Sequence, residues 1–281
     1  MIFMILATFY IACSSENENE EAVLLEKKFL KSRIYTNLPA DIPNRDEFYE
    51  YKNELLKTAS GGKLQGEYSY DSDEKLTLKS KGSEQFSYEY DGNGRIIKQN
   101  EIGTNNYIEL FYENNKVITH RYYEFGNTNG APNSYLEERE LLIDNQGRIT
   151  KMVDLATNQS PSDTDYEIYE YDGKGNISRV ITKKSNQQEE RISNYEYMDV
   201  KNPYFYSLKK YYEKTYYLEF YSGLNFEKID FVITSNYGIT PNLIWYDDIK
   251  TYEVNDFYYP TKEFYKQHFT NVYEIIYEYS E

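Results

Sequence analysis

The sequence predicts an all-β fold, a meander of antiparallel hairpins that forms a long, twisted and curled sheet. Two observations carry this prediction. The chain of 281 residues contains 34 tyrosines, a residue type that packs well in strands. From about residue 64 onward, short segments with the same turn residues recur at uneven intervals. We therefore expect about 12 strands between residues 64 and 281, with one or two short helices before them.

The repeated element is a hairpin turn with an acidic residue near its start. Its copies are Tyr70–Leu76, Tyr90–Ile96, Ile143–Ile149 and Tyr171–Ile177, with a shortened copy at Tyr112–Val117. Aspartate at the first position of a type I turn, followed by a glycine in the left-handed region, is the favoured chemistry of a three-residue hairpin loop. We predict that the structural turn residues are Asp91, Gly94, Asp144, Gly147, Asp172 and Gly175. Glu74 takes the glycine position in the first copy, which is expected to be distorted.

Counting outward from these turns predicts the register of each hairpin. Tyr90 should face Ile96, and Tyr171 should face Ile177, so that an aromatic and an aliphatic side chain meet on one face of the sheet. The acidic residues are accordingly interpreted as turn formers and not as catalytic groups or metal ligands.

Two segments before the repeats carry helix-like patterns. Residues 21–35 have apolar side chains at a loose helical spacing. In residues 45–59, Asn44 can cap a helix with Glu47 three residues on, while Phe48, Tyr51 and Leu55 share one helical face. A strand through Phe48–Tyr51 is the competing interpretation. The predicted organisation is a signal peptide over 1–12, a tether over 13–22, a helical segment over 23–63 and a sheet domain over 64–281.

The first residues form an apolar run that ends at Ala12 and Cys13. Eleven residues are too few for a helix that spans a bilayer, but they suit the apolar region of a signal peptide. This end resembles the bacterial lipoprotein signal, although Tyr10 stands where leucine is usual and no Lys or Arg precedes the run. The resemblance implies cleavage before Cys13, a lipid on its thiol and attachment to the outer membrane. The alternative is an ordinary thiol in an uncleaved N-terminus.

The segment Ser14–Glu21 contains no apolar residue, so it is expected to be an extended tether. It also resembles the serine-plus-acidic export signal of surface lipoproteins in the Bacteroidota, which implies a location facing the cell surface. A solvated spacer is the alternative.

Charge and composition exclude several classes of function. The formal net charge is −16, which opposes binding to the phosphates of nucleic acid. Cys13 is the single cysteine, and His120 and His268 have no partners at metal-ligand spacing, so we expect neither a disulfide nor a metal nor another cofactor. No nucleophile elbow or nucleotide-binding loop occurs. We therefore expect no catalytic residues, while a pair of carboxylates in a glycosidase cleft stays open as an alternative.

The hairpin copies are similar to the YD repeats of RHS-type proteins, which share the Tyr-Asp and Gly-Arg-Ile elements. The match covers roughly residues 66–185. Later elements, such as Tyr252–Asn255 followed by Tyr259–Lys262, resemble the C-terminal part of Bacteroidota lipoproteins with YD-like hairpins. These resemblances imply an envelope location and no particular chemistry. The chain has too few units to enclose a toxin, as the large RHS proteins do.

The tyrosines allow two interpretations. They either form a ladder that stabilises an open sheet, or they provide a surface for a glycan or peptide ligand, for which we favour residues 204–259. On the last strand, Tyr273, Ile275, Tyr277 and Tyr279 are expected to share one face. The functional hypothesis is a non-enzymatic, lipid-anchored envelope protein that acts as a binding or scaffold module. The alternative is a secreted-side carbohydrate-active enzyme or an accessory protein of glycan uptake.

Overall fold

The structure is a computed structural model that describes residues 29–36, 38, 45–62, 64–125, 133–155, 165–184, 190–219, 230–238, 249–267 and 271–280. In this part of the chain it contains two helices and an 18-stranded sheet. The elements are β1 (Leu30–Thr36), β2 (Glu47–Lys52), β3 (Leu55–Ser60), β4 (Gly66–Tyr70), β5 (Leu76–Lys81), β6 (Glu84–Tyr90), β7 (Ile96–Glu101), β8 (Tyr107–Glu113), β9 (Lys116–Phe125), β10 (Asn133–Ile143), β11 (Ile149–Asp154), β12 (Tyr166–Tyr171), β13 (Ile177–Lys183), β14 (Arg191–Lys201), α1 (Pro203–Ser207), α2 (Lys209–Glu219), β15 (Asp230–Gly238), β16 (Ile249–Val254), β17 (Pro260–Gln267) and β18 (Asn271–Tyr279). The predicted all-β antiparallel meander is confirmed.

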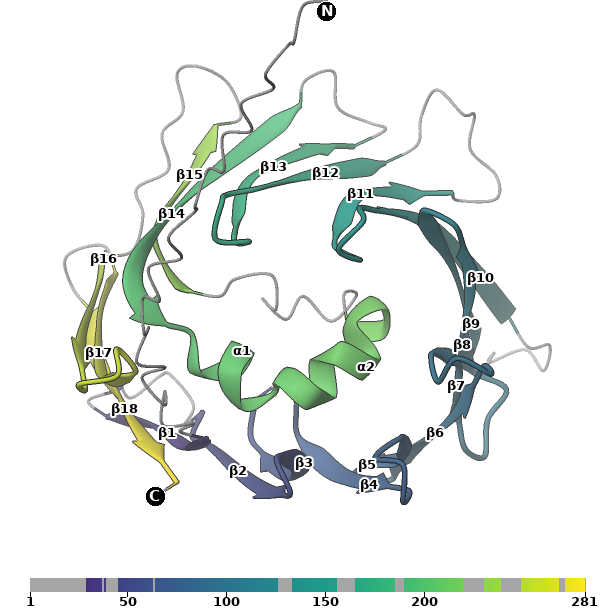
Figure 1. The fold of residues 1–281 in the computed structure, drawn as a ribbon, viewed down its shortest axis with the longest axis horizontal. Helices are drawn as coiled ribbons and strands as arrows, with labels where there is room; N and C mark the ends of the chain where they lie inside the picture. The colour runs from purple at the N-terminus through teal and green to yellow at the C-terminus, as the bar shows by residue number, and fades with distance from the viewer. Residues whose placement is uncertain are drawn as a thin grey trace, which may run out of the picture.

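The sheet curls round into a ring that is not closed (Figure 1). From β2 to β15, each strand pairs antiparallel with the one before it. At the other side, β16 pairs with β17 and β17 with β18, while β1 lies between β18 and β2. Among the described residues, no strand pairing is found between β15 and β16.

The two helices lie inside the ring (Figure 1). Asn202 caps α1 by accepting the backbone N–H of Tyr204 at 3.0 Å, and Pro203 occupies the first helical position. In α2, Tyr211, Tyr212 and Leu218 are buried against the strands. We call the strand face that packs on the helices the inner face, and the opposite face the outer face.

The buried side chains form two clusters that share the helices as their centre. The first joins Leu208 and Tyr211 to strands near both ends of the chain, such as Leu30 on β1 and Ile275 on β18. The second packs Leu218 against the inner face of β7–β13. The helices therefore supply the core that the curled sheet alone could not enclose.

The predicted N-terminal helices are wrong. Residues 45–59 form most of the β2–β3 hairpin, so the competing strand interpretation was the right one. Asn53 and Glu54 occupy the left-handed region and turn the chain within two residues. Phe48 faces outward while Tyr49 is buried, which is strand alternation and not a helical face. In the segment 21–35, residues 30–35 belong to β1, and residues 21–28 lie outside the described part.

The predicted sheet domain also differs from the structure in one place. We expected strands throughout residues 64–281, but α1 and α2 interrupt them after β14. The paired tyrosines of residues 211–217 therefore lie on a helix. The buried residues on this segment recur at a helical spacing and not at the alternate positions of a strand; they are Tyr211, Tyr212, Thr215 and Leu218. On β18 the expected alternation is present, with Ile275 and Tyr277 buried and Ile276 exposed.

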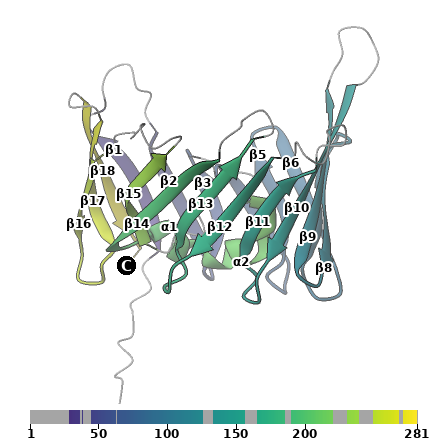
Figure 2. The same cartoon turned by 90° about the horizontal axis from the view of Figure 1, so that it is seen from above.

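The hairpin turns lie along one rim of the ring (Figure 2). Gly94, Gly147 and Gly175 have φ angles of 77°, 78° and 91°, and Glu74 occupies the equivalent position with φ of 59°. Tyr90 faces Ile96 and Tyr171 faces Ile177, in each case next to a one-residue register shift. The turn chemistry read from the sequence thus corresponds to bulged three-residue loops.

Gly94 and Gly92 provide a test of this turn within one loop. Gly94→Ala places a Cβ at a positive φ, and we expect a loss of about 1–2 kcal/mol in the free energy of unfolding. A Cβ on Gly92 would meet no atom within 4 Å, and Gly92 has no positive φ, so Gly92→Ala is the matched control with little or no loss. Thermal or denaturant unfolding of the two variants measures the difference. Equal losses would contradict the turn assignment.

Candidate functional site

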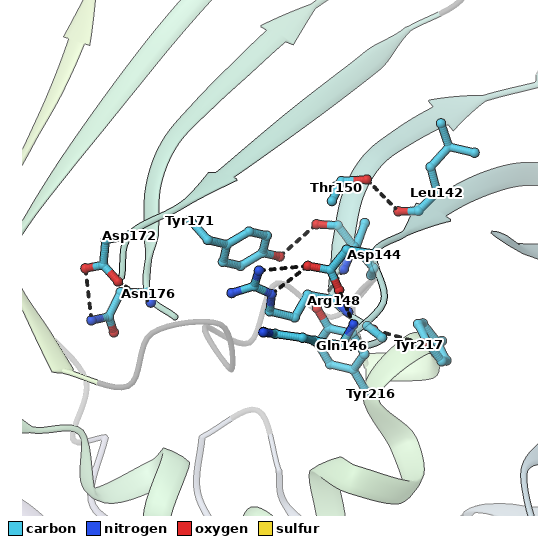
Figure 3. A network of polar contacts seen from close by, with 12 residues as sticks. Leu142, Asp144, Gln146, Arg148, Thr150, Tyr171, Asp172, Asn176, Tyr216 and Tyr217 are labelled. Atoms are coloured by element: carbon cyan, nitrogen blue, oxygen red, sulfur yellow. Dashed lines mark hydrogen bonds and ion pairs between the residues drawn. The ribbon is translucent and has the colours of Figure 1, made fainter. Parts of the chain in front are cut away.

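Two of the hairpin turns are tied to the next hairpin by an Asp-Arg-Tyr contact, and Figure 3 shows the one built on Asp144. Asp144 Oδ1 accepts the backbone N–H groups of Gln146 and Arg148 at 2.9 Å, and its Oδ2 accepts Arg148 Nε at 2.8 Å. The Arg148 guanidinium lies 4.3 Å from the centroid of the Tyr171 ring. The same arrangement occurs two hairpins earlier in the chain, with Asp91, Arg95 and Tyr112.

The same aspartates are held in their charged form by the turn. The pKa of Asp91 lies below its ordinary value, mainly because its carboxylate accepts a hydrogen bond from the backbone N–H of Arg95. Both oxygens of the Asp91 carboxylate accept hydrogen bonds from its own loop, and Asp144 is held in the same way.

The tyrosine hydroxyls of the repeat donate to backbone carbonyls of the hairpin before them. Each acceptor is the residue that follows a bulged turn, where one residue is taken out of the ladder. Such a carbonyl needs a partner, because a buried unsatisfied acceptor is costly. The pairs are Tyr90 to Leu76 at 2.7 Å, Tyr112 to Ile96 at 2.8 Å, Tyr171 to Ile149 at 2.7 Å, Tyr197 to Ile177 at 2.6 Å and Tyr279 to Pro260 at 2.8 Å.

We call this hydrogen bond from a tyrosine hydroxyl to the carbonyl after a bulged turn the tyrosine hook. Two positions lack the hook, and the geometry of the preceding turn explains both cases. Ile143 stands in the hook position after β8–β9, whose two-residue turn has no bulge. Tyr70 follows the β2–β3 hairpin, whose register shift lies elsewhere in the ladder, and the Tyr70 hydroxyl has no hydrogen-bond partner among the residues described. Where the hook forms, the tyrosine hydroxyl of a unit thus binds a carbonyl of the preceding hairpin. This partner cannot be identified by aligning the repeats.

Sequence analysis missed a further bulged turn. Asn255 accepts the backbone N–H of Phe257 and Tyr259, and Tyr258 takes the left-handed position with φ of 63°. Asparagine can replace aspartate as the acceptor of such a turn. The signal that could have identified it is Asn255 placed four residues before Tyr259, as Asp91 is placed before Arg95.

A buried charged cluster lies where the two ends of the chain meet. Arg33 on β1 is 3.2 Å from Glu47 on β2, and its guanidinium lies 5.2–5.5 Å from the ring centroids of Tyr35, Tyr204 and Tyr277. Glu47 also accepts the hydroxyl of Tyr204 at 2.5 Å. Only 14% and 11% of the Arg33 and Glu47 side chains are exposed.

A second carboxylate completes this cluster. Glu263 on β17 is 3% exposed and accepts the Tyr277 hydroxyl at 2.6 Å. Burial raises the pKa of Tyr204 and Tyr277 far above the ordinary value, which keeps both phenols neutral as donors. These carboxylates, phenols and the guanidinium are buried and contact one another across β1, β2, β17, β18 and α1. The arrangement connects β1 to both of its neighbouring strands.

Aromatic and aliphatic side chains, together with His120, lie on the outer face of β8, β9 and β10. We call this surface the outer patch; it consists of Tyr107, Phe111, Ile118, His120, Tyr122 and Leu136. Phe111 is 45% exposed and Leu136 38% exposed. The register places the patch in three rows. Tyr107, Tyr122 and Leu136 form the Tyr122 row, Glu109, His120 and Glu138 form the His120 row, and Phe111, Ile118 and Glu140 form the Ile118 row.

Charged side chains surround and divide the outer patch. Lys98 pairs with Glu109 at 2.8 Å, Lys116 with Glu140 at 3.0 Å, and His120 with Glu138 at 3.3 Å. Glu124 accepts the Tyr122 hydroxyl at 2.9 Å. Four glutamates therefore face two lysines here, so the surface has acidic character.

The tyrosines of the outer patch cover one another. The Tyr107 and Tyr122 rings are stacked with centroids 5.3 Å apart and an interplanar angle of 16°. Lys98 lies 4.5 Å from the Tyr107 centroid. The faces of the Tyr107 ring are thus occupied by the protein itself, which leaves Phe111 and Leu136 as the most exposed apolar groups of the patch.

Of the contact region that the sequence favoured, residues 204–259, the structure describes residues 204–219, 230–238 and 249–259. Tyr211 and Tyr212 are buried inside the ring, and Tyr258 is exposed at a turn. His120 belongs to the outer patch, while His268 lies outside the described residues. No group of His, Cys, Asp and Glu side chains in the described part is arranged to hold a metal ion.

The predicted lipid site, Cys13, and the acidic tether also lie outside the described residues, so both stay predictions. Neither helix in the described part of the chain is long and apolar enough to cross a bilayer.

Comparison with known proteins identifies no family. No protein-family model matches the chain, and no curated protein matches it, so the resemblance to YD repeats and to Bacteroidota lipoproteins stays a prediction. Among solved structures, the chain is similar to a porin-like protein from Bacteroides vulgatus, with a TM-score of 0.39 and 12% sequence identity, over 90% of this chain and 99% of that one.

Proposed function

We propose that the protein is a non-enzymatic, lipid-anchored module of the cell envelope that binds a partner on the outer face of its ring. The observation that carries this proposal is the outer patch, where Phe111 and Leu136 stay exposed on a sheet whose other large side chains are mostly packed. The repeated tyrosines support it indirectly, because their hydroxyls hold one hairpin to the next and make the ring a rigid support.

Binding without turnover is the expected result for the whole protein. Candidate ligands, both glycans and peptides, are captured by the purified mature chain, and the recovered ligand is examined for cleavage. We expect intact ligand, since the clustered carboxylates Glu47 and Glu263 are buried. Release of reducing sugar or peptide fragments, abolished by changing one Asp or Glu, would establish the alternative of a carbohydrate-active enzyme.

The lipid anchor has a separate test. Cells that express the protein are labelled with a clickable fatty acid, and we expect label on the wild type and none on Cys13→Ser. The apolar run that ends at Ala12 and Cys13 is the reason for this expectation. Equal labelling of both proteins would remove the anchor from the proposal and leave the binding test unaffected.

A further inference from the structure

We infer that the outer patch binds an extended peptide segment of a partner protein, with apolar side chains at positions i and i+4 and a basic side chain at i+2. This inference rests on the proposed function and names the ligand of the same surface. Three properties of the outer patch support it, namely the spacing of its rows, its charge and the state of its aromatic rings.

The spacing of the rows fits an extended chain. The Tyr122 row and the Ile118 row are four residues apart along β9, and the His120 row lies midway between them. At about 3.4 Å per residue, the Tyr122 and Ile118 rows are about 14 Å apart. An extended peptide that lies along β9 has the same rise, so its alternate side chains on one face fall on successive rows.

The charge of the middle row selects a basic residue. Glu109 and Glu138 flank His120, and their side chains are 30% and 29% exposed. Each carboxylate already has one partner, but an ionised carboxylate can accept several donors. A lysine or arginine at i+2 would lie over these two acids, whereas an acidic side chain would be repelled. The overall charge of −16 favours the approach of the same basic segment.

The state of the aromatic rings disfavours a sugar at this surface. A sugar ring stacks on an exposed aromatic face, but Tyr107 has Tyr122 on one side and Lys98 in contact with its ring. Phe111 is tilted against His120 with centroids 4.8 Å apart, so its exposed part suits an aliphatic side chain in contact with its edge.

The test uses a synthetic peptide with the order Leu-Thr-Lys-Thr-Leu at its centre, a second peptide in which glutamate replaces the lysine, and a panel of neutral polysaccharides. We expect the purified chain to bind the lysine peptide at least tenfold more tightly than the glutamate peptide, and the affinity should fall as salt rises. Phe111→Ser should weaken binding about tenfold. Phe48→Ser is the matched control, because Phe48 is 47% exposed on the outer face of β2, away from the patch, and should leave the affinity unchanged.

A charge variant separates the middle row from the apolar rows. Glu138→Gln should weaken binding of the lysine peptide about fivefold and flatten its salt dependence, and it should leave the thermal midpoint of the protein unchanged because Glu138 is only half-buried. Equal binding of the two peptides, or unchanged binding by Phe111→Ser, would overturn the inference. If Phe111→Ser instead abolishes capture of a polysaccharide that stays intact, the peptide is wrong while the proposed binding function stands. Cleavage of the captured ligand would contradict the proposed function itself.

Discussion

Arg33→Met is expected to lower the free energy of unfolding by about 3–5 kcal/mol, the range found when one partner of a buried ion pair is removed. The variant leaves the Glu47 carboxyl almost fully buried without its guanidinium partner, with the hydroxyls of Tyr49 and Tyr204 as its remaining donors. Denaturant unfolding at neutral pH measures the loss. Lys209→Met is the control, because the Lys209–Glu213 pair is 63% and 61% exposed, and its loss should cost less than about 1 kcal/mol.

A double variant tests whether the buried charge is the cause. Arg33→Met combined with Glu47→Gln removes both charges but keeps an acceptor for the two phenols. We expect it to recover a large part of the stability that Arg33→Met loses. A double variant as unstable as the sum of its single changes would indicate that packing around Arg33, and not its charge, holds this part of the sheet together.

Tyr90→Phe is expected to destabilise the protein by about 1–3 kcal/mol, because it leaves the Leu76 carbonyl without its donor at a buried position. Burial raises the pKa of Tyr90 to about 12, so the hydroxyl remains a donor throughout the neutral range. The measurement is again the free energy of unfolding in denaturant.

Tyr70→Phe is the matched control for this prediction. Tyr70 occupies the same place in its hairpin, and its hydroxyl is buried without a hydrogen-bond partner in the described structure. Removing that hydroxyl should therefore be neutral or slightly stabilising. Similar losses in the two variants would show that the tyrosines act through their rings alone, and the hook would then have no energetic role.

The comparison of Tyr70 with Tyr90 shows what could be predicted from the sequence. Local chemistry was readable, since aspartate and glycine determine a turn within four residues, and Glu74 adopts the strained conformation that its position implied. The partner of each tyrosine was not readable, because it depends on whether the preceding hairpin has a bulge. The same dipeptide, Tyr-Asp, therefore occurs in one unit with a hydrogen-bonded tyrosine hydroxyl and in another with a tyrosine hydroxyl that has no partner in the described structure.

The elements that sequence analysis misassigned share a physical cause. Phe48, Tyr51 and Leu55 satisfy a helical spacing, but the turn at Asn53 places Leu55 on a new strand, so tertiary pairing overrides local propensity. The outer patch could not be located either. Its members come from three strands, and only the register brings Phe111, His120 and Leu136 onto one surface.

The position of β1 between β2 and β18 determines the order in which the strand pairings of the sheet can form. Leu30 pairs with Tyr279, about 250 residues later in the sequence, so one side of β1 has no strand to bind until β18 has been synthesised. Arg33 likewise meets Tyr277 only then. Hairpins between these ends can form as they emerge, each from neighbouring residues, whereas the final joining must overcome the entropy of closing nearly the whole chain. A chain that lacks β18 would therefore carry a sheet with one edge of β1 unpaired, and this edge is covered only once β18 is present.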